Sequence, residues 1–306
     1  MTISSAERNA RRMLPLMRLM QATMPLRWSD QLNRWSLNRA QMPEGVVRRP
    51  VSADGVPCDW LIPINSPDDR ALLYLHGGGF VYGQSLPHLE MGAYLAQKIG
   101  ARVLMVDYRL APAHPFPAAL DDCLTAYRWL LKQATPKPKI AIAGDSAGGN
   151  LAITTMMKLR DSGEQLPVAG ALLSPVADLS TEHNTADPYN DPLLPARAMK
   201  RYKRSYVAGH DPRDPLISPV FGNWHDLPPL LIHVGEDEIL RSDAEQIEKL
   251  ARTAGVDVRL EVYPRMWHVW QIMMAMPQSI QSLDDIAGFL TASLEQRQVP
   301  TSDAQR

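Results

Sequence analysis

A serine between glycines is the part of this sequence best suited to covalent chemistry. The segment GDSAG, at residues 144–148, follows the apolar run 140–143 and precedes a stretch with helical spacing. Strand, sharp turn and helix are the setting of a nucleophile elbow, in which glycines relieve the close contacts of the turn and expose the serine hydroxyl. The alternative is a serine that only caps the helix. We predict that Ser146 is a nucleophile.

Three consecutive glycines earlier in the chain could supply the hydrogen-bond donors that a serine nucleophile needs. The segment HGGGF, at residues 76–80, closes the apolar run 71–75. Backbone N–H groups in such a turn are not shielded by side chains and can point at one oxygen, as an oxyanion hole demands. We predict Gly78 and Gly79 as donors, with the amide of Ala147 as the third. A merely flexible glycine turn is the alternative.

A serine hydroxyl needs a general base, and that base needs a carboxylate to orient it. In the elbow arrangement the chain order is serine, acid, histidine. His268 follows the last expected strand, where a loop can present it above the sheet, so we predict it as the base. His233 falls inside an expected strand and is predicted to be a core histidine. The remaining histidines after the serine are expected to be surface or lid groups: His183, His210 and His225.

The orienting carboxylate is expected in the acidic cluster at residues 236–238, directly after the expected strand 230–234. The carboxyl end of a strand in a parallel sheet is where ligands bind, so these side chains lie on the active side. Asp237 is our choice. Glu236, Glu238 and Asp243 remain possible on geometry alone.

The order of elements predicts an α/β fold with a mainly parallel sheet, because short β-rich runs alternate with helical stretches from about residue 45. The expected strands are 56–63, 71–76, 102–106, 139–143, 169–173, 230–234 and 259–262. The expected helices are 86–99, 117–133, 147–162, 241–254 and 279–295, with one more near 196–207.

Two regions stand outside this alternation and are predicted to cover the site. Residues 1–45 read as helices, and an insertion at about 178–224 interrupts the catalytic domain, which spans 46–298. Residues 299–306 are expected to be a disordered tail. An apolar stripe at helical spacing in the first helix is expected to be packing surface or, alternatively, a pocket wall: Met13, Leu16, Met17, Met20 and Met24.

Composition narrows the function further. The chain has 32 basic and 33 acidic residues, which argues against a nucleic-acid binder and favours a small uncharged substrate. Cys58 and Cys123 are expected to be buried free thiols in a reducing, cytoplasmic setting. No signal peptide or transmembrane helix is expected.

No cofactor or metal is expected either. The sequence has no dinucleotide-binding fingerprint after a first strand. His183, Asp187 and Asp191 match no zinc or calcium spacing that we can justify.

At these motifs the chain resembles the hormone-sensitive lipase family of microbial carboxylesterases, which have the α/β-hydrolase fold. The matching segments are HGGGF at 76–80, VDYRLAPAHPFPAALDD at 106–122, GDSAGGNLA at 144–152, DPLISPVFG at 214–222, LPPLLIHVGEDEIL at 227–240 and MWHVW at 266–270. The resemblance implies Ser146, Asp237 and His268 as a triad and the same oxyanion donors. It also implies that His76 and Asp145 shape the site and that residues 1–45 and 180–208 form a cap.

The resemblance further implies hydrolysis of short- to medium-chain acyl esters and a possible homodimer. Phe80, Tyr82, Asp145 and Trp267 are the expected pocket residues. The sequence departs from the family at Ala113 and at Arg265, which is expected to place a cation beside the mouth of the site. The alternatives are an amidase, peptidase or lactone hydrolase with the same triad, a lipase for long-chain fats, and a non-catalytic receptor on the same fold.

Overall fold

The centre of the molecule is an eight-stranded sheet with the order β1-β2-β4-β3-β5-β6-β7-β8. The structure, a computed structural model, describes residues 4–23, 37, 40–133, 138–180 and 191–296. Each neighbouring pair in the order β4-β3-β5-β6-β7-β8 is parallel, whereas β2 is antiparallel to both β1 and β4. The predicted mainly parallel sheet is confirmed. The strand bounds are β1 Val46–Ala53, β2 Val56–Pro63, β3 Arg70–Leu75, β4 Arg102–Val106, β5 Lys139–Asp145, β6 Gly170–Leu173, β7 Leu230–Gly235 and β8 Val258–Tyr263.

Strand β1 was not predicted. Its sequence contains Arg48, Arg49 and Pro50, and most of its residues are at least partly exposed, whereas those of inner strands such as β5 and β7 are almost all buried. It forms an edge of the sheet and, among the described strands, pairs only with β2. Proline and charged residues are typical of edge strands, because one side of the strand carries no hydrogen-bond ladder.

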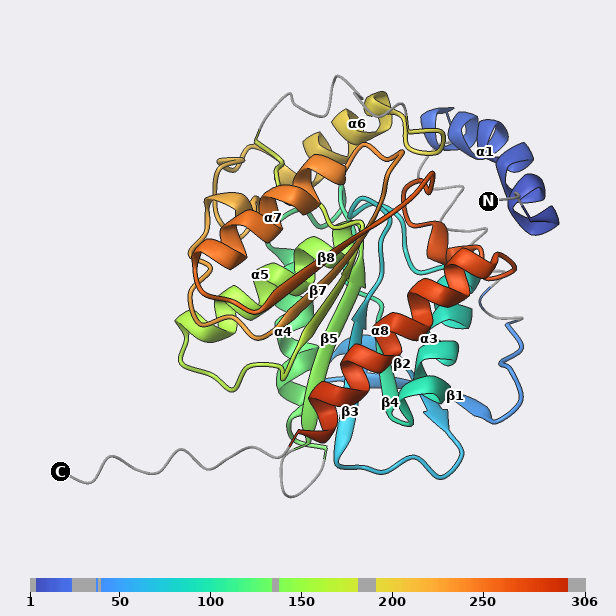
Figure 1. The fold of residues 1–306 in the computed structure, drawn as a ribbon. Helices are drawn as coiled ribbons and strands as arrows, with labels where there is room; N and C mark the ends of the chain where they lie inside the picture. The colour runs from blue at the N-terminus through green and yellow to red at the C-terminus, as the bar shows by residue number, and fades with distance from the viewer. Residues whose placement is uncertain (1–3, 24–36, 38–39, 134–137, 181–190, 297–306) are drawn as a thin grey trace.

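Helices cover both faces of the sheet (Figure 1). α3 and α8 lie on one face, and α4, α5 and α7 lie on the other. Alternating strand residues feed the two resulting cores: Leu73 and Leu75 belong to one, and Leu72 and Tyr74 to the other. The helix bounds are α1 Ser5–Thr23, α3 Leu86–Ile99, α4 Ala118–Leu130, α5 Ala147–Asp161, α6 Ala196–Val207, α7 Arg241–Thr253 and α8 Pro277–Glu295, with 3-10 turns η2 Pro219–Phe221 and η3 Trp270–Ile272.

Helix α1 is fixed to the C-terminal part of the chain by a buried carboxylate. Glu7 accepts hydrogen bonds from Arg11 Nε at 3.0 Å and from Gln278 Nε2 at 2.8 Å. Arg11 Nη2 in turn donates to the carbonyl of Arg265 at 2.7 Å. Leu14 is buried in a cluster with the large side chains just beyond β8: Met266, Trp267, Trp270 and Met276, joined by Leu193. The N-terminal helix therefore packs against the segment that carries His268.

The face of α1 that packs is not the one we predicted. Met13, Leu16 and Met20 are exposed, and Met17 is only half-buried. Met24 lies outside the described residues. The expectation that this stripe is packing surface is therefore wrong for its exposed members, because Glu7 and Leu14 hold the opposite face of the helix inward.

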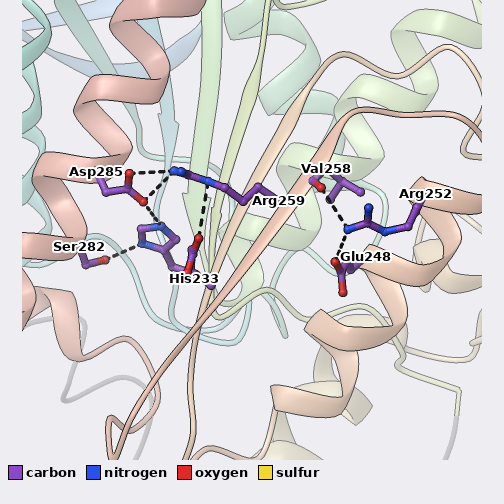
Figure 2. A network of polar contacts seen from close by, with 8 residues as sticks. His233, Glu248, Arg252, Val258, Arg259, Ser282 and Asp285 are labelled. Atoms are coloured by element: carbon purple, nitrogen blue, oxygen red, sulfur yellow. Dashed lines mark hydrogen bonds and ion pairs between the residues drawn. The ribbon is translucent and has the colours of Figure 1, made fainter.

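His233 ties α8 to the sheet (Figure 2). The ring is fully buried in β7, with Nδ1 2.7 Å from Ser282 Oγ and Nε2 3.0 Å from Asp285 Oδ2. Arg259 on β8 donates to both oxygens of Asp285 at 2.8 Å. Burial lowers the pKa of His233, although Asp285 partly offsets this change. The prediction of a core histidine is confirmed.

This network makes the free energy of unfolding depend on pH. His233 holds the pKa of Asp285 at about 2, below its usual 3.8, with a smaller effect from Arg259. A lowered carboxylate pKa contributes stability that is present above pH 3.8 and is lost as the pH falls towards 2. We expect Asp285→Asn to lower the free energy of unfolding by about 1 kcal/mol at pH 7, a small value because 35% of the side chain is exposed.

Urea unfolding of the wild type and of Asp285→Asn at pH 7, 5, 4 and 3 measures this effect. The difference between the two proteins should shrink below pH 4. A difference that stays constant down to pH 3 would contradict the role given to the Asp285 carboxylate.

Candidate active site

The turn between β5 and α5 holds Ser146 in an unusual backbone conformation. Its φ is 53° and its ψ is −118°, a region that non-glycine residues rarely adopt. The turn is tight, because a Cβ atom on Gly144 would collide with the carbonyl of Gly148, and one on Gly148 would collide with the carbonyl of Leu75. The amide of Ser146 donates to Leu173 O at 2.8 Å, which fixes the turn to β6. This is the geometry expected of a nucleophile elbow.

The hydroxyl of Ser146 lies beside the imidazole of His268. Ser146 Oγ and His268 Nε2 are 3.0 Å apart, although 122 residues separate them in the sequence. Both side chains are largely buried. Burial by itself lowers the pKa of His268, but the nearby carboxylate of Glu238 and the charges of Asp191 and Asp145 raise it overall. The structure therefore brings the predicted nucleophile and base together.

The carboxylate next to His268 belongs to Glu238, and our choice of Asp237 needs correction. Glu238 Oε1 lies 3.6 Å from His268 Nδ1, and neither atom has a hydrogen-bond partner among the described residues. Catalytic hydrogen bonds are often long before substrate binds. The other oxygen, Oε2, accepts from Gly235 N and from Ser174 Oγ, both at 2.8 Å. Glu238 is fully buried, whereas Asp237 is half-exposed.

The local turn explains this difference. The Gly235 amide draws the side chain three residues later back beneath the strand end, while the amide of Asp237 donates to Met266 O at 2.9 Å. Of the other two candidates, Glu236 Oε2 accepts from the amide of Arg265 at 2.8 Å. Asp243 is buried, which raises its pKa to about 7, and it accepts from two backbone amides, those of residues 177 and 178. Neither contacts His268.

Ser174 is a site residue that our sequence reasoning missed. Its hydroxyl donates to Glu238 and accepts from the amide of Val269 at 3.1 Å, so it links the acid to the loop that follows His268. It is buried and has a φ of 47°. The only local signal is its position directly after the apolar strand β6, at the same edge of the sheet as Ser146.

The glycine turn after β3 is fixed from below by Asp145. Asp145 Oδ1 accepts from Tyr74 Oη at 2.8 Å and from the amide of Gly77 at 3.0 Å. The first glycine of the turn thus has its donor occupied. Gly78 and Gly79 have φ values of 118° and 61° and line the cavity beside Ser146. Ala147 begins α5, where backbone N–H groups have no partner within the helix.

Two histidines surround the Asp145 carboxylate. His88 Nε2 lies 3.4 Å from Asp145 Oδ2, and the ring of His76 stacks on Tyr108 with centroids 4.2 Å apart. Burial would raise the pKa of Asp145, but His88 and the hydrogen bond from Tyr74 lower it overall. Burial and the charge of His88 lower the pKa of His76 to about 4, so His76 is neutral at pH 7. Asp145 therefore stays ionised and keeps its hold on the glycine turn.

A cavity of about 210 Å3 opens above Ser146 and His268. Phe80, Tyr82 and Asp145 line it, as the sequence predicted. Its remaining walls are mainly apolar and come from the insertion and the His268 loop: Val176, Leu179, Leu193, Leu194, Met199, Tyr202, Val269 and Ile272. Gln21 of α1 and Lys203 of α6 complete the lining.

Two of our expectations for the cavity need correction. Trp267 does not line it, because its indole is buried under α1 with the guanidinium of Arg11 5.1 Å from the ring centroid. Arg265, which we expected beside the mouth of the site, is not among the residues that line the cavity. Its guanidinium lies 3.8 Å from the carboxylate of Glu7, and the residue lines a separate hollow with residues of β8 and α8.

Asp191 joins the insertion to the loop of Glu238. Its Oδ1 accepts from the amides of Leu193 and Leu194, and its Oδ2 accepts from the amide of Ile239. Burial raises the pKa of Asp191 to about 6, although the charge of His268 opposes this rise. His183 and Asp187, which we considered with it as metal ligands, lie outside the described residues. Within the described ranges no three His, Cys, Asp or Glu side chains form a group that could hold a metal ion.

Taken together, the sheet, the elbow and the Ser146–His268 contact define an α/β hydrolase. The chain matches the family described as alpha/beta hydrolase fold over residues 72–272. An acetyl-hydrolase of Streptomyces hygroscopicus is 37% identical over 288 residues, which cover 90% of this chain and 96% of the relative.

Two solved structures agree with this match. An esterase from the bacterial hormone-sensitive lipase family is 36% identical with a TM-score of 0.84, covering 96% of this chain and all of that one. A hormone-sensitive lipase from a metagenome library is 35% identical with a TM-score of 0.84, covering 93% of this chain and 98% of that one. The chain belongs to the hormone-sensitive lipase family of α/β hydrolases and is a carboxylic ester hydrolase.

Substitution of Glu238 and of Asp237 tests directly which carboxylate orients His268. We expect Glu238→Gln to lower kcat on an activated ester by roughly 10³- to 10⁴-fold, because the imidazole loses its orienting charge. Asp237→Asn should leave kcat within about threefold, a change too small for a triad member. Steady-state kinetics of both variants measure this difference, and a larger loss in Asp237→Asn than in Glu238→Gln would restore our original choice.

Ser174 should affect the rate through Glu238. A hydrogen bond to a charged group contributes about 1.5–3 kcal/mol, so Ser174→Ala is expected to lower kcat by roughly 10- to 100-fold with a smaller effect on KM. Ser293→Ala is the matched control, since its hydroxyl bonds only to the Phe289 carbonyl within α8. Equal rates for Ser174→Ala and the wild type would show that the Glu238 carboxylate needs no such support.

Proposed function

We propose that this enzyme hydrolyses short- to medium-chain acyl esters through an acyl-enzyme on Ser146. The observation that carries the proposal is the 3.0 Å contact between Ser146 Oγ and His268 Nε2 in the strained turn after β5. A serine with a neutral imidazole at this distance can be deprotonated as it attacks a carbonyl. The Glu238 carboxylate, 3.6 Å from His268 Nδ1, orients the ring and stabilises the imidazolium that forms.

The reaction then has two halves. Ser146 Oγ attacks the ester carbonyl while His268 takes its proton, and the amides of Gly78, Gly79 and Ala147 receive the oxyanion. His268 returns the proton to the departing alcohol, which leaves the acyl group on Ser146. Water activated by His268 attacks this acyl-enzyme, and collapse of the second tetrahedral intermediate releases the carboxylic acid.

The shape of the cavity supports the limit on acyl length. It is small, about 210 Å3, and its walls are mainly aliphatic and aromatic. A short acyl chain gains free energy by burying each methylene against such walls. A long chain has no room without movement of α6, whose Met199 and Tyr202 form part of the wall.

We also propose a cytoplasmic protein that forms homodimers. Cys58 and Cys123 are buried free thiols, which suits a reducing compartment. Among the described helices none is long and apolar enough to cross a membrane. The unpaired edge of β8, the last strand of the sheet, supports the dimer, since such edges are commonly covered by a second chain. α1 and α6, which both line the cavity, are proposed to form its cap.

Initial rates on p-nitrophenyl esters from acetate to palmitate test the function. We expect the highest kcat/KM at short or medium acyl chains and loss of activity in Ser146→Ala, because the serine carries the acyl group. The matching anilides should react far more slowly. Preference for anilides would favour the amidase, and equal activity of Ser146→Ala would exclude Ser146 as the nucleophile.

A further inference from the structure

The outward face of α1 is an apolar stripe without a covering element among the described residues. Met13 is 58% exposed, Leu16 61%, Leu19 58% and Met20 39%. Their spacing places them on one side of the helix. The opposite side is fixed by Leu14 and by Glu7 with its hydrogen bonds, so the stripe cannot turn inward without breaking that anchor. A contiguous exposed apolar patch of this kind marks an interaction surface.

Cations line the outward face of the neighbouring helix α6. Arg197, Lys200 and Arg204 follow one another at spacings of three and four, and all are exposed. They share a hollow of about 450 Å3 with Ala22 of α1. No ion pair among the described residues involves these three side chains, and α6 contains no acidic residue.

The C-terminal end of the helix that carries the stripe meets the helix that carries the cations. Arg201 Nη2 donates to the carbonyl of Gln21 at 3.1 Å, and Figure 1 shows α1 and α6 as neighbours above the sheet. The two helices carry nine basic residues and one acidic residue, the buried Glu7, which gives a formal charge of +8. The whole chain has a net charge of only −1. Positive charge is thus concentrated on these two helices, one of which carries the stripe.

We propose that α1 and α6 bind the enzyme to the surface of anionic lipid bilayers. Helices that lie in a membrane interface combine an apolar face with neighbouring Lys and Arg side chains, which attract anionic headgroups. The stripe is the convex side of a helix. A protruding apolar face suits insertion among acyl chains, whereas a binding site for a protein segment would more typically be a groove. Exposed aliphatic side chains do not suit a nucleic acid, whose backbone is fully charged.

The proposed lipid-binding helices also form part of the catalytic cavity. Gln21 of α1 and Met199, Tyr202 and Lys203 of α6 line it, so the helices that contact lipid also form its wall. An enzyme bound in this way holds its substrate cavity against the bilayer, where apolar esters accumulate. The proposal concerns binding, and it stands whichever ester is hydrolysed.

Co-sedimentation of the full chain with lipid vesicles tests the proposal. The wild type should bind vesicles of phosphatidylcholine with 25% phosphatidylglycerol and should bind pure phosphatidylcholine at least about tenfold more weakly, with the difference reduced at high salt. The stripe variant Met13→Ser/Leu16→Ser/Leu19→Ser and the charge variant Arg197→Gln/Lys200→Gln/Arg204→Gln should each lower the partition coefficient by roughly 10- to 100-fold.

The matched control removes the same charge from exposed lysines elsewhere: Lys132→Gln/Lys158→Gln/Lys249→Gln should bind like the wild type. All three triple variants should keep the kcat of the wild type on soluble p-nitrophenyl acetate, which shows that they fold. Equal binding to neutral and anionic vesicles, or equal loss in the control, would overturn the proposal. Light scattering gives a further test. A wild-type dimer that the stripe variant abolishes would also overturn the proposal, since a second copy would then cover the stripe.

Discussion

The site depends on the absence of a Cβ atom at Gly144 and Gly148, because a side chain at either position would collide with the backbone. Only glycine allows β5 to end, turn and enter α5 so close to the carbonyls of Leu75 and Gly148. This packing holds Ser146 at a φ of 53° with its hydroxyl toward the edge where the parallel strands end. The strained backbone conformation of Ser146 costs about 1–3 kcal/mol. It is maintained by the two hydrophobic cores that pack against the two faces of the sheet.

Buried negative charge surrounds the imidazole that serves this serine. Glu238, Asp191 and Asp145 each raise the pKa of His268 against the effect of burial. Each is itself held by hydrogen-bond donors: Glu238 by Gly235 and Ser174, Asp191 by three amides, and Asp145 by Tyr74 and Gly77. Because the carboxylates lie on separate segments, the insertion, the end of β5 and the loop after β7 all contribute to the electrostatics of one ring.

Features set by local sequence could be predicted, and features set by tertiary packing could not. The strands β2 to β8 follow from apolar runs, and the turns at Ser146 and Gly78 follow from glycines. The choice between Asp237 and Glu238 depends on which side chain the Gly235 amide captures, and the sequence pattern is the same for both. The buried face of α1 depends on its partners beyond β8, Trp267 and Met266, so an apolar stripe alone pointed to the wrong side.

Covalent labelling by a fluorophosphonate, followed by peptide mass spectrometry, tests the central claim most directly. The reagent phosphonylates a serine only when that serine is activated by its base. We predict a single adduct on Ser146, labelling slowed by a large factor in Glu238→Gln and nearly unchanged in Asp237→Asn. An adduct on another serine, or labelling of Ser146 at the same rate in Glu238→Gln as in the wild type, would contradict the site described here.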